Sequence, residues 1–133
     1  MIGVIDILRD DASVGARVGG TGTSARVYPN VRAQKGALPA VTVSLTQTEA
    51  HDTKDGVSTL DEEYVTVTSY SDDFTECRNL AQDCRSALDR ASGTYNSQVI
   101  QSIQFLDEFN DYEQIKNNIV YFIEQNYKVR VLR

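Results

Sequence analysis

The end of the chain contains a long alternating pattern that restricts the possible folds more than any other feature. Between residues 119 and 131, one set of side chains is largely apolar and the other is mixed. The first set is Ile119, Tyr121, Ile123, Tyr127, Val129 and Val131, and the second is Val120, Phe122, Glu124, Asn126, Lys128 and Arg130. A period of two is typical of a β-strand with one buried face. A strand of this length would span about 43 Å, so we expect it to bend, bulge or leave its sheet.

Two earlier segments also have the composition of strands. Residues 38–46 alternate, with Val41, Val43 and Leu45 on one face, which predicts a half-buried strand. Arg26-Val27-Tyr28-Pro29 predicts a short edge strand, because a proline cannot donate a hydrogen bond to a neighbouring strand.

The middle of the chain predicts a hairpin and further strands. Residues 64–70 are rich in β-branched and aromatic side chains. Before them, the polar stretch 47–61 contains Lys54-Asp55-Gly56, whose Asp-Gly pair favours a turn between antiparallel strands. A later strand face is predicted from Val99, Ile103 and Phe105. The acidic stretch 107–113 is too charged for a core strand, so we expect a connector there.

Two segments have apolar residues at helical spacing. Residues 2–18 predict one amphipathic helix of about four turns that stops at Gly19-Gly20. A second helix is predicted over about 72–91, capped by Ser71 or Asp72. The apolar stripe of this second helix consists of Phe74, Cys77, Ala81, Cys84, Leu88 and Ala91. The two cysteines on the stripe are too far apart on one helix for a disulfide, so we expect free thiols.

Together these elements predict an α+β fold, a mostly antiparallel sheet of about four to five strands with two helices packed on one face. A chain of 133 residues has the size of one domain, so we expect residues 1–133 to form a single unit. The sequence has no recognisable membrane-spanning stretch or signal peptide, and we expect a soluble, unsecreted protein.

The charge balance limits the partners of the protein. The sequence has 19 acidic and 13 basic residues, a formal net charge of −6. This charge argues against binding nucleic acid by neutralising phosphates, whereas a role beside DNA stays open. The seven tyrosines and four phenylalanines either close a small core or leave apolar surface for assembly with other chains, and both interpretations fit.

The candidate catalytic groups form no recognisable site. His51 is the only histidine, and a catalytic or metal-binding role would require further oriented partners. The run Gly19-Gly20-Thr21-Gly22-Thr23-Ser24 lacks the lysine of a phosphate-binding P-loop. Cys77 and Cys84 do not form a Cys-x-x-Cys motif. We therefore expect no enzyme activity, no cofactor and no metal, although a glycosidase-like pair of carboxylates stays an alternative.

Several segments follow each other in a characteristic order. They are Arg26-Val27-Tyr28-Pro29, a polar spacer, Leu38-Pro39-Ala40-Val41-Thr42-Val43, Tyr64-Val65-Thr66-Val67, a helix with Leu80-Ala81 and Ala87-Leu88, Asp111-Tyr112-Glu113, and Tyr127-Lys128-Val129-Arg130-Val131. In this order the segments resemble the phage tail terminator proteins, also called tail completion proteins, over nearly the whole chain. The sequence departs from that family at Ala40, where relatives often have an aromatic residue, and in the long polar stretch 47–61.

The resemblance implies a structural protein of the virion, made in the host cytoplasm and placed at the junction of tail and neck. Members of the family form a ring, here expected to be a hexamer. The ring caps the tail tube protein, ends its polymerisation and joins the tail to a head-closure or connector protein. The resemblance further implies that DNA passes through the bore without specific binding, and that neither a membrane nor a catalytic residue is involved.

Two polar, glycine-containing segments lie between the predicted elements, where binding segments are often found. We expect the loop 47–60 to be a projecting contact arm and the connector 19–24 to become ordered on assembly. The candidate partner-contacting residues are Thr48, Glu49, His51, Asp52, Lys54 and Asp55 in the loop and Gly19, Gly20, Thr21 and Gly22 in the connector.

Other functions fit the same residues. A different neck component, such as a head-closure or adaptor protein, would share the ring assembly. A bacterial contractile-injection or prophage-derived particle would use the same capping part. A small soluble α+β enzyme or ligand-binding domain is an alternative from another class. Binding to a tail tube protein separates the terminator from this last class.

Overall fold

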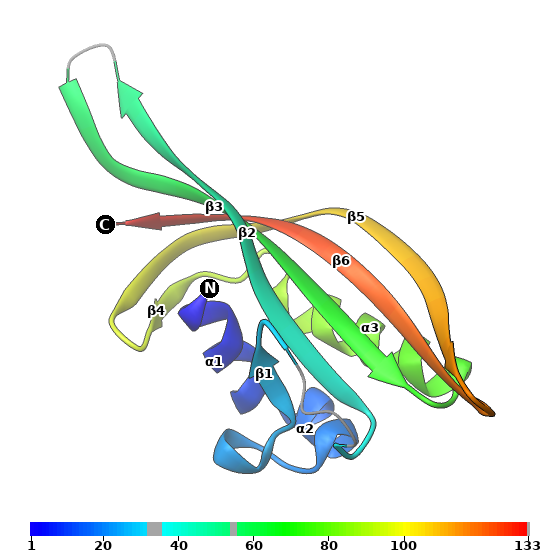
Figure 1. The fold of residues 1–133 in the computed structure, drawn as a ribbon. Helices are drawn as coiled ribbons and strands as arrows, with labels where there is room; N and C mark the ends of the chain where they lie inside the picture. Colours follow the sequence, from blue (N-terminus) through cyan, green and yellow to red (C-terminus); the bar gives the residue numbers. More distant parts are fainter. Residues whose placement is uncertain (32–35, 54–55, 133) are drawn as a thin grey trace.

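The computed structural model describes residues 1–31, 36–53 and 56–132 (Figure 1). Its helices are α1 (Ile2–Asp10), α2 (Ala12–Val18), the short 3-10 helix η1 (Gly22–Ser24) and α3 (Phe74–Leu88). Its strands are β1 (Val27–Pro29), β2 (Ala40–Thr53), β3 (Gly56–Ser71), β4 (Gly93–Tyr95), β5 (Gln98–Ile115) and β6 (Asn118–Leu132). The predicted α+β class is confirmed.

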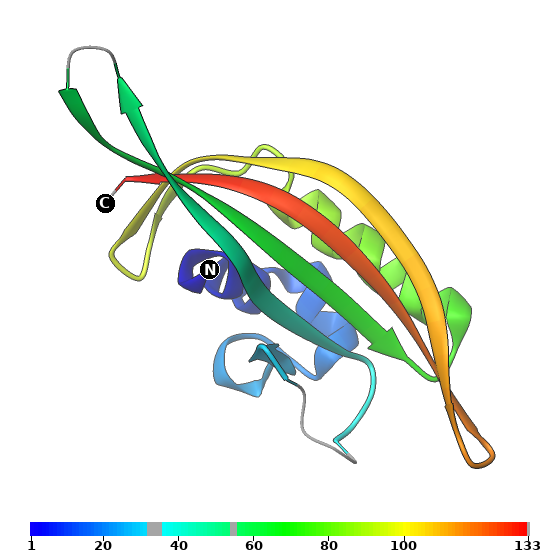
Figure 2. The same ribbon diagram turned by 45° about the horizontal axis from the view of Figure 1, so that its top comes forward.

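The strands of the described residues form one six-stranded sheet in the order β1-β2-β3-β6-β5-β4. β1 is parallel to β2, and the other neighbouring strands are antiparallel. The strand number exceeds the prediction because β4 has only three residues and no alternating pattern. Figure 2 shows all three α-helices on the same face of the curved sheet, which leaves the other face without a helix.

The predicted helix over residues 2–18 is interrupted at Asp11, where α1 ends and α2 begins. Asp11 has extended backbone angles, and its Oδ1 accepts hydrogen bonds from the backbone N–H groups of Ser13 and Val14 at 3.0 Å. An aspartate at this position caps a new helix better than it continues the old one. The prediction of one long helix was therefore wrong, whereas its end at Gly19 is confirmed by the positive φ of 92°.

The second predicted helix is confirmed as α3, but its cap is Asp73 and not Ser71 or Asp72. The Asp73 carboxylate accepts from the N–H of Glu76 at 3.3 Å, and Ser71 Oγ accepts from the N–H of Asp73. Phe74 was predicted on the buried stripe, yet it is 43% exposed because it begins the helix. The buried residues of α3 are Cys77, Leu80, Ala81, Cys84 and Leu88.

The hydrophobic core fills the space between the helices and one sheet face. Leu8 of α1, Leu80 of α3 and Val67 of β3 are almost completely buried in it. Cys77 and Cys84 are free and buried, as predicted. Burial raises the pKa of Cys77 to about 11 and that of Cys84 to about 12, so both thiols stay protonated at neutral pH.

The sheet curves because its outer long strands contain bulges. β2 has an extra residue, Thr46, and β5 has an extra residue, Leu106. Both lie next to the same row of paired residues, which contains Val65 of β3 and Tyr127 of β6. Extra residues on the outer strands bend the sheet around its centre. The long C-terminal strand, β6, is thus confirmed, and the bend comes from bulges in β2 and β5 while β6 pairs with β3 without a shift from Tyr121 to Leu132.

Two predicted connections are strands. The acidic stretch 107–113 belongs to β5, and most of the predicted loop 47–61 belongs to β2 and β3. The charge argument for a connector was wrong because this part of β5 pairs only with β6 and its side chains are exposed. A further bulge at Gln101 shifts the alternation, so Ile100 is buried and Val99 is 36% exposed, contrary to the face predicted from Val99.

Candidate assembly surfaces

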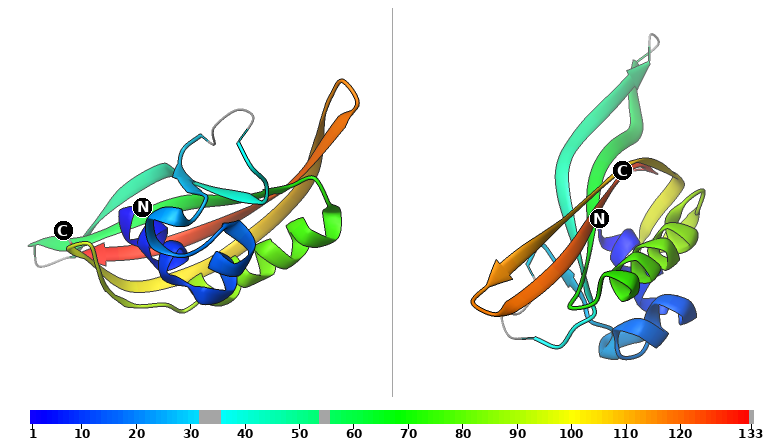
Figure 3. Two further views of the ribbon diagram at one scale, coloured as in Figure 1. Left: turned by 90° about the horizontal axis from the view of Figure 1, so that it is seen from below. Right: turned by 90° about the vertical axis from the view of Figure 1, so that its right-hand side faces the viewer.

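Two hairpin arms extend from opposite ends of the sheet (Figures 1 and 3). We call residues 47–53 and 56–60 of β2 and β3 the β2–β3 arm, and residues 107–122 of β5 and β6 the β5–β6 arm. The β5–β6 arm closes with a tight turn in which Lys116 has a positive φ of 57°. Both arms continue strands that are anchored in the core, so their direction is fixed by the sheet.

The β2–β3 arm contains one of the two predicted contact segments. Thr48 and Glu49 are exposed and pair across the arm with Glu63 and Glu62. Of the other candidates in this segment, His51 and Asp52 belong to strand β2, whereas Lys54 and Asp55 lie outside the described residues. Because neighbouring strand residues alternate, Thr48 and Glu49 present opposite faces of the arm.

The second predicted contact segment, residues 19–24, lies at the end of α2, far from the β2–β3 arm (Figure 1). Gly19, Gly20 and Gly22 all have positive φ, and the N–H of Gly20 donates to the carbonyl of Gly15 at 2.8 Å. At Gly19 an added Cβ would lie 2.3 Å from Nη1 of Arg26, so this glycine allows the arginine to pack closely. Thr21 is exposed beside them. The structure therefore does not bring the two predicted segments together.

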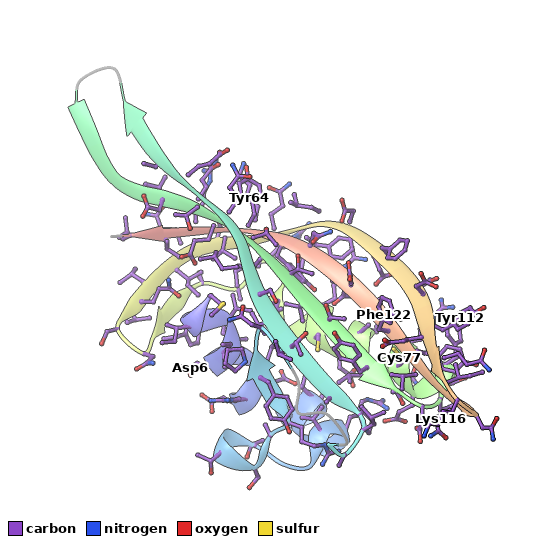
Figure 4. All side chains as sticks on the ribbon, viewed as in Figure 1. Asp6, Tyr64, Cys77, Tyr112, Lys116 and Phe122 are labelled. Carbon is purple, nitrogen blue, oxygen red and sulfur yellow. The ribbon has the colours of Figure 1, made fainter. Side chains whose placement is uncertain are left out.

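The sheet face without helices is polar and aromatic. On β3, Val65 and Val67 face the helices, so Tyr64, Thr66, Thr68 and Tyr70 face the other way. They pair with Lys128, Asn126, Glu124 and Phe122 of β6. Near the β5–β6 arm, where Figure 4 labels Phe122 and Tyr112, these two side chains line a shallow hollow of about 370 Å³ together with Tyr70, Glu113 and Glu124.

Charge is unevenly distributed along this open face. At the end next to the β2–β3 arm, Glu62 forms ion pairs with Lys128 at 3.5 Å and Arg130 at 3.4 Å. At the other end, the exposed carboxylates belong to the β5–β6 arm, and Asp111 and Glu113 are among them. The face thus offers side chains for contact with another macromolecule, with an acidic end and a charge-balanced end.

Comparison with known proteins identifies the family. The family described as "Tail completion protein gp17" matches residues 3–131. This chain belongs to that family. It is a structural protein of the virion tail that assembles with other tail and head proteins, and it is not an enzyme.

A solved structure has the same fold as this tail completion protein. A chain of the virion of a native gene transfer agent (GTA) particle matches with a TM-score of 0.64 and 23% sequence identity. The match covers 98% of this chain and 92% of that chain. No curated protein matches the sequence.

The tail completion protein holds the base of its β5–β6 arm through a buried polar chain. Gln125, which is fully buried, donates to the carbonyl of Ala81 in α3 at 3.0 Å and to Glu108 at 2.9 Å. Its Oε1 accepts from the hydroxyl of Tyr127 at 3.0 Å. Burial raises the pKa of Tyr127, so this hydroxyl remains a donor. The sequence offered one signal for this site, the polar Gln125 between apolar Ile123 and Tyr127 on the buried side of the strand.

Two other kinds of feature would bear on function, a metal site and a membrane-spanning helix. Within 1–31, 36–53 and 56–132, no group of three histidine, cysteine, aspartate or glutamate residues is placed to hold a metal ion. None of the helices in these ranges has the length and apolar character needed to cross a bilayer.

Proposed function

We propose that this protein assembles, as a hexamer, into a ring that caps the tail tube, ends its polymerisation and joins the tail to the head connector. The family match over residues 3–131 carries the proposal. The two arms support it, because a capping ring must contact its own copies and at least one further protein.

In the proposed complex the β2–β3 arm contacts the tail tube protein, with Thr48 and Glu49 among the contacting residues, and the connector 19–24, which lies far from this arm (Figure 1), contacts a different partner. A cap must bind the end of a polymer without offering an equivalent new end. An arm on one end of the subunit provides such a one-sided contact, since the opposite end carries a different, acidic hairpin. The other side of the ring is then free to bind the head-closure or connector protein.

DNA passes through the bore of the proposed ring without specific binding. Each subunit has a formal net charge of −6, and this charge repels phosphates over a distance of about one Debye length. A bore lined by acidic and neutral side chains lets DNA slide, whereas clustered lysines and arginines would hold it.

The test measures assembly with and without the tail tube protein by light scattering and negative-stain microscopy. We expect rings of about six copies seated on the tube ends, and shorter tubes. A protein that stays monomeric or dimeric and leaves tube growth unchanged would overturn the proposal. Rings that bind a head connector protein but leave tube growth unchanged would indicate a head-closure or adaptor protein instead.

A shortened variant tests the role of the β2–β3 arm. Ala50 and Asp61 are paired, so replacing residues 51–60 by Asn-Gly closes the hairpin at that pair with a two-residue turn. We expect the variant to melt like the wild type and to form rings, but to leave tubes uncapped. Normal tails built with this variant would exclude the outer part of the β2–β3 arm, residues 51–60, as the tube contact.

A further inference from the structure

Exposed large apolar side chains lie on both edges of the sheet, and others lie elsewhere, such as Ile2 of α1 and Phe74 of α3. Among the described residues, Phe109 and Tyr112 of the β5–β6 arm are 55% and 58% exposed, and Leu106 beside them is 42% exposed. At the other edge, Val31 follows β1 and is 75% exposed, and Leu45 of β2 is 42% exposed. Apolar side chains at this exposure are typical of surfaces that a partner covers.

The two apolar groups carry opposite charge in their surroundings. Residues 107–124 contain Asp107, Glu108, Asp111, Glu113 and Glu124 and one basic residue, Lys116. Residues 12–48, which include β1 and the start of β2, contain no acidic residue and four basic ones. Two of these four belong to the described residues: Arg17, which forms ion pairs with Glu76 and Asp83 of α3, and Arg26, whose Nε donates to the carbonyl of Pro39.

These edges lie on opposite sides of one subunit. β1 is the first strand of the sheet, whereas β5 is on the far side of the order and is covered by β4 only from Gln98 to Ile100. We call the surface of Arg26, Pro29, Val31 and Leu45 the β1 edge. Pro29 and Val31 are exposed there, and the N–H of Asn30 donates to the carbonyl of Val43 at 2.8 Å, which fixes the chain that follows β1 to β2.

We propose that the β5–β6 arm of one copy docks on the β1 edge of the next copy, and that this contact closes the ring. The inference rests on the proposed function, since it names the contact by which the proposed ring forms. Phe109 and Tyr112 pack against Val31 and Leu45, and the carboxylates around them face Arg26. Complementary charge at the rim of an apolar contact sets its orientation and its rate of formation.

The charges also select the symmetry. A two-fold contact between two arms would place like charges together, and one neighbour cannot reach both the arm and the β1 edge, because these lie on opposite sides of the subunit. A head-to-tail contact joins unlike edges, so each copy binds one neighbour with its arm and the other with its β1 edge. Contacts of this kind produce a ring when the rotation closes. The buried chain through Gln125 holds the base of the arm on α3, so little order has to be gained on docking.

The test uses two sets of substitutions on exposed positions. Asp111→Lys with Glu113→Lys reverses the arm, and Val31→Glu places a carboxylate on the β1 edge. The control is Asp10→Lys with Asp72→Lys, an equal change of charge at exposed positions outside both surfaces and outside the β2–β3 arm. Ring formation is measured by analytical ultracentrifugation over a range of protein concentrations, alone and on tail tubes, after thermal melting has shown each variant to be folded.

We expect the arm variant and Val31→Glu each to need about tenfold more protein for half assembly, or more. The control should assemble at the same protein concentration as the wild type. The variant that combines Asp111→Lys, Glu113→Lys and Val31→Glu should need at most about threefold more protein than the wild type, because its lysines then face a glutamate. Equal assembly of the arm variant and the wild type would refute the docking but leave the ring, and so would a triple variant that does not recover. A wild type that forms no ring alone or on tubes would refute the proposed function itself.

Discussion

The hydrogen bond between the Tyr127 hydroxyl and Gln125 Oε1, 3.0 Å long, should contribute measurably to stability because both side chains are fully buried. Gln125→Leu removes the acceptor and leaves a buried hydroxyl without a partner, a cost of about 1 to 3 kcal/mol. Ala81 lies inside α3, so its carbonyl keeps a helical donor, and the exposed Glu108 can turn to water. Tyr127→Phe leaves the buried Gln125 oxygen unpaired, at a cost of about 1 to 2 kcal/mol.

The double variant removes both partners at once. Replacing donor and acceptor by apolar groups avoids a buried unpaired atom, so we expect the double variant to lose about 1 to 2 kcal/mol less than the sum of the single variants. The free energy of unfolding is measured by urea titration with circular dichroism. The matched control combines Gln125→Leu with Tyr95→Phe, because the Tyr95 hydroxyl donates to the carbonyl of Ser92 in an exposed position. If the losses in the free energy of unfolding from the Gln125 and Tyr127 substitutions are additive, as expected for the control pair, the buried hydrogen bond does not contribute as argued.

Four further outcomes follow from the core and the caps. Cys77 and Cys84, with pKa values raised by burial to about 11 and about 12, should react with a thiol reagent at pH 8 only after unfolding, and equal rates in both states would contradict their burial. Because the folded chain holds these protons more tightly, stability should fall as pH rises above about 9, seen as a lower urea midpoint. Asp11→Ala should cost about 1 kcal/mol, while Asp10→Ala, at an exposed position without a cap contact, should cost little. Leu80→Ala should cost about 2 to 5 kcal/mol, and a smaller change in melting would show that the core collapses around it.

The elements that the sequence predicts best are those whose pattern matches their burial along their full length. Strand β6 alternates between a buried and an open face from Ile123 to Val131, and α3 buries a stripe that includes Leu80, Cys84 and Leu88. The break at Asp11 could not be derived from the apolar spacing, because the spacing continues across it. There the structure is decided by the hydrogen bonds that the Asp11 side chain accepts from the N–H groups of Ser13 and Val14.

The β5–β6 arm was not predicted from the sequence, for a different reason. The prediction assumed that every strand has a buried face, and the carboxylates of residues 107–113 are incompatible with a buried face. Once β6 provides a partner, backbone pairing needs no buried face, and charged side chains are compatible with it. The extra residues Thr46, Gln101 and Leu106 are likewise invisible in the sequence, since a bulge depends on the register of two strands and not on one residue.

The cost of binding through the predicted contact arm, residues 47–60, depends on whether the arm is a strand or a loop. A flexible loop must be ordered when it binds, which costs about 0.5 to 1.5 kcal/mol for each immobilised side chain. The β2–β3 arm continues β2 and β3 beyond the buried Val43 and Val67, and the β5–β6 arm continues strands that contain the buried Ile103 and Val129. Much of that ordering cost is thus met when the sheet folds. In the proposed binding to the end of the tail tube, such preformed arms make recognition depend on geometry, since an arm held by the core cannot adapt to a wrongly placed partner.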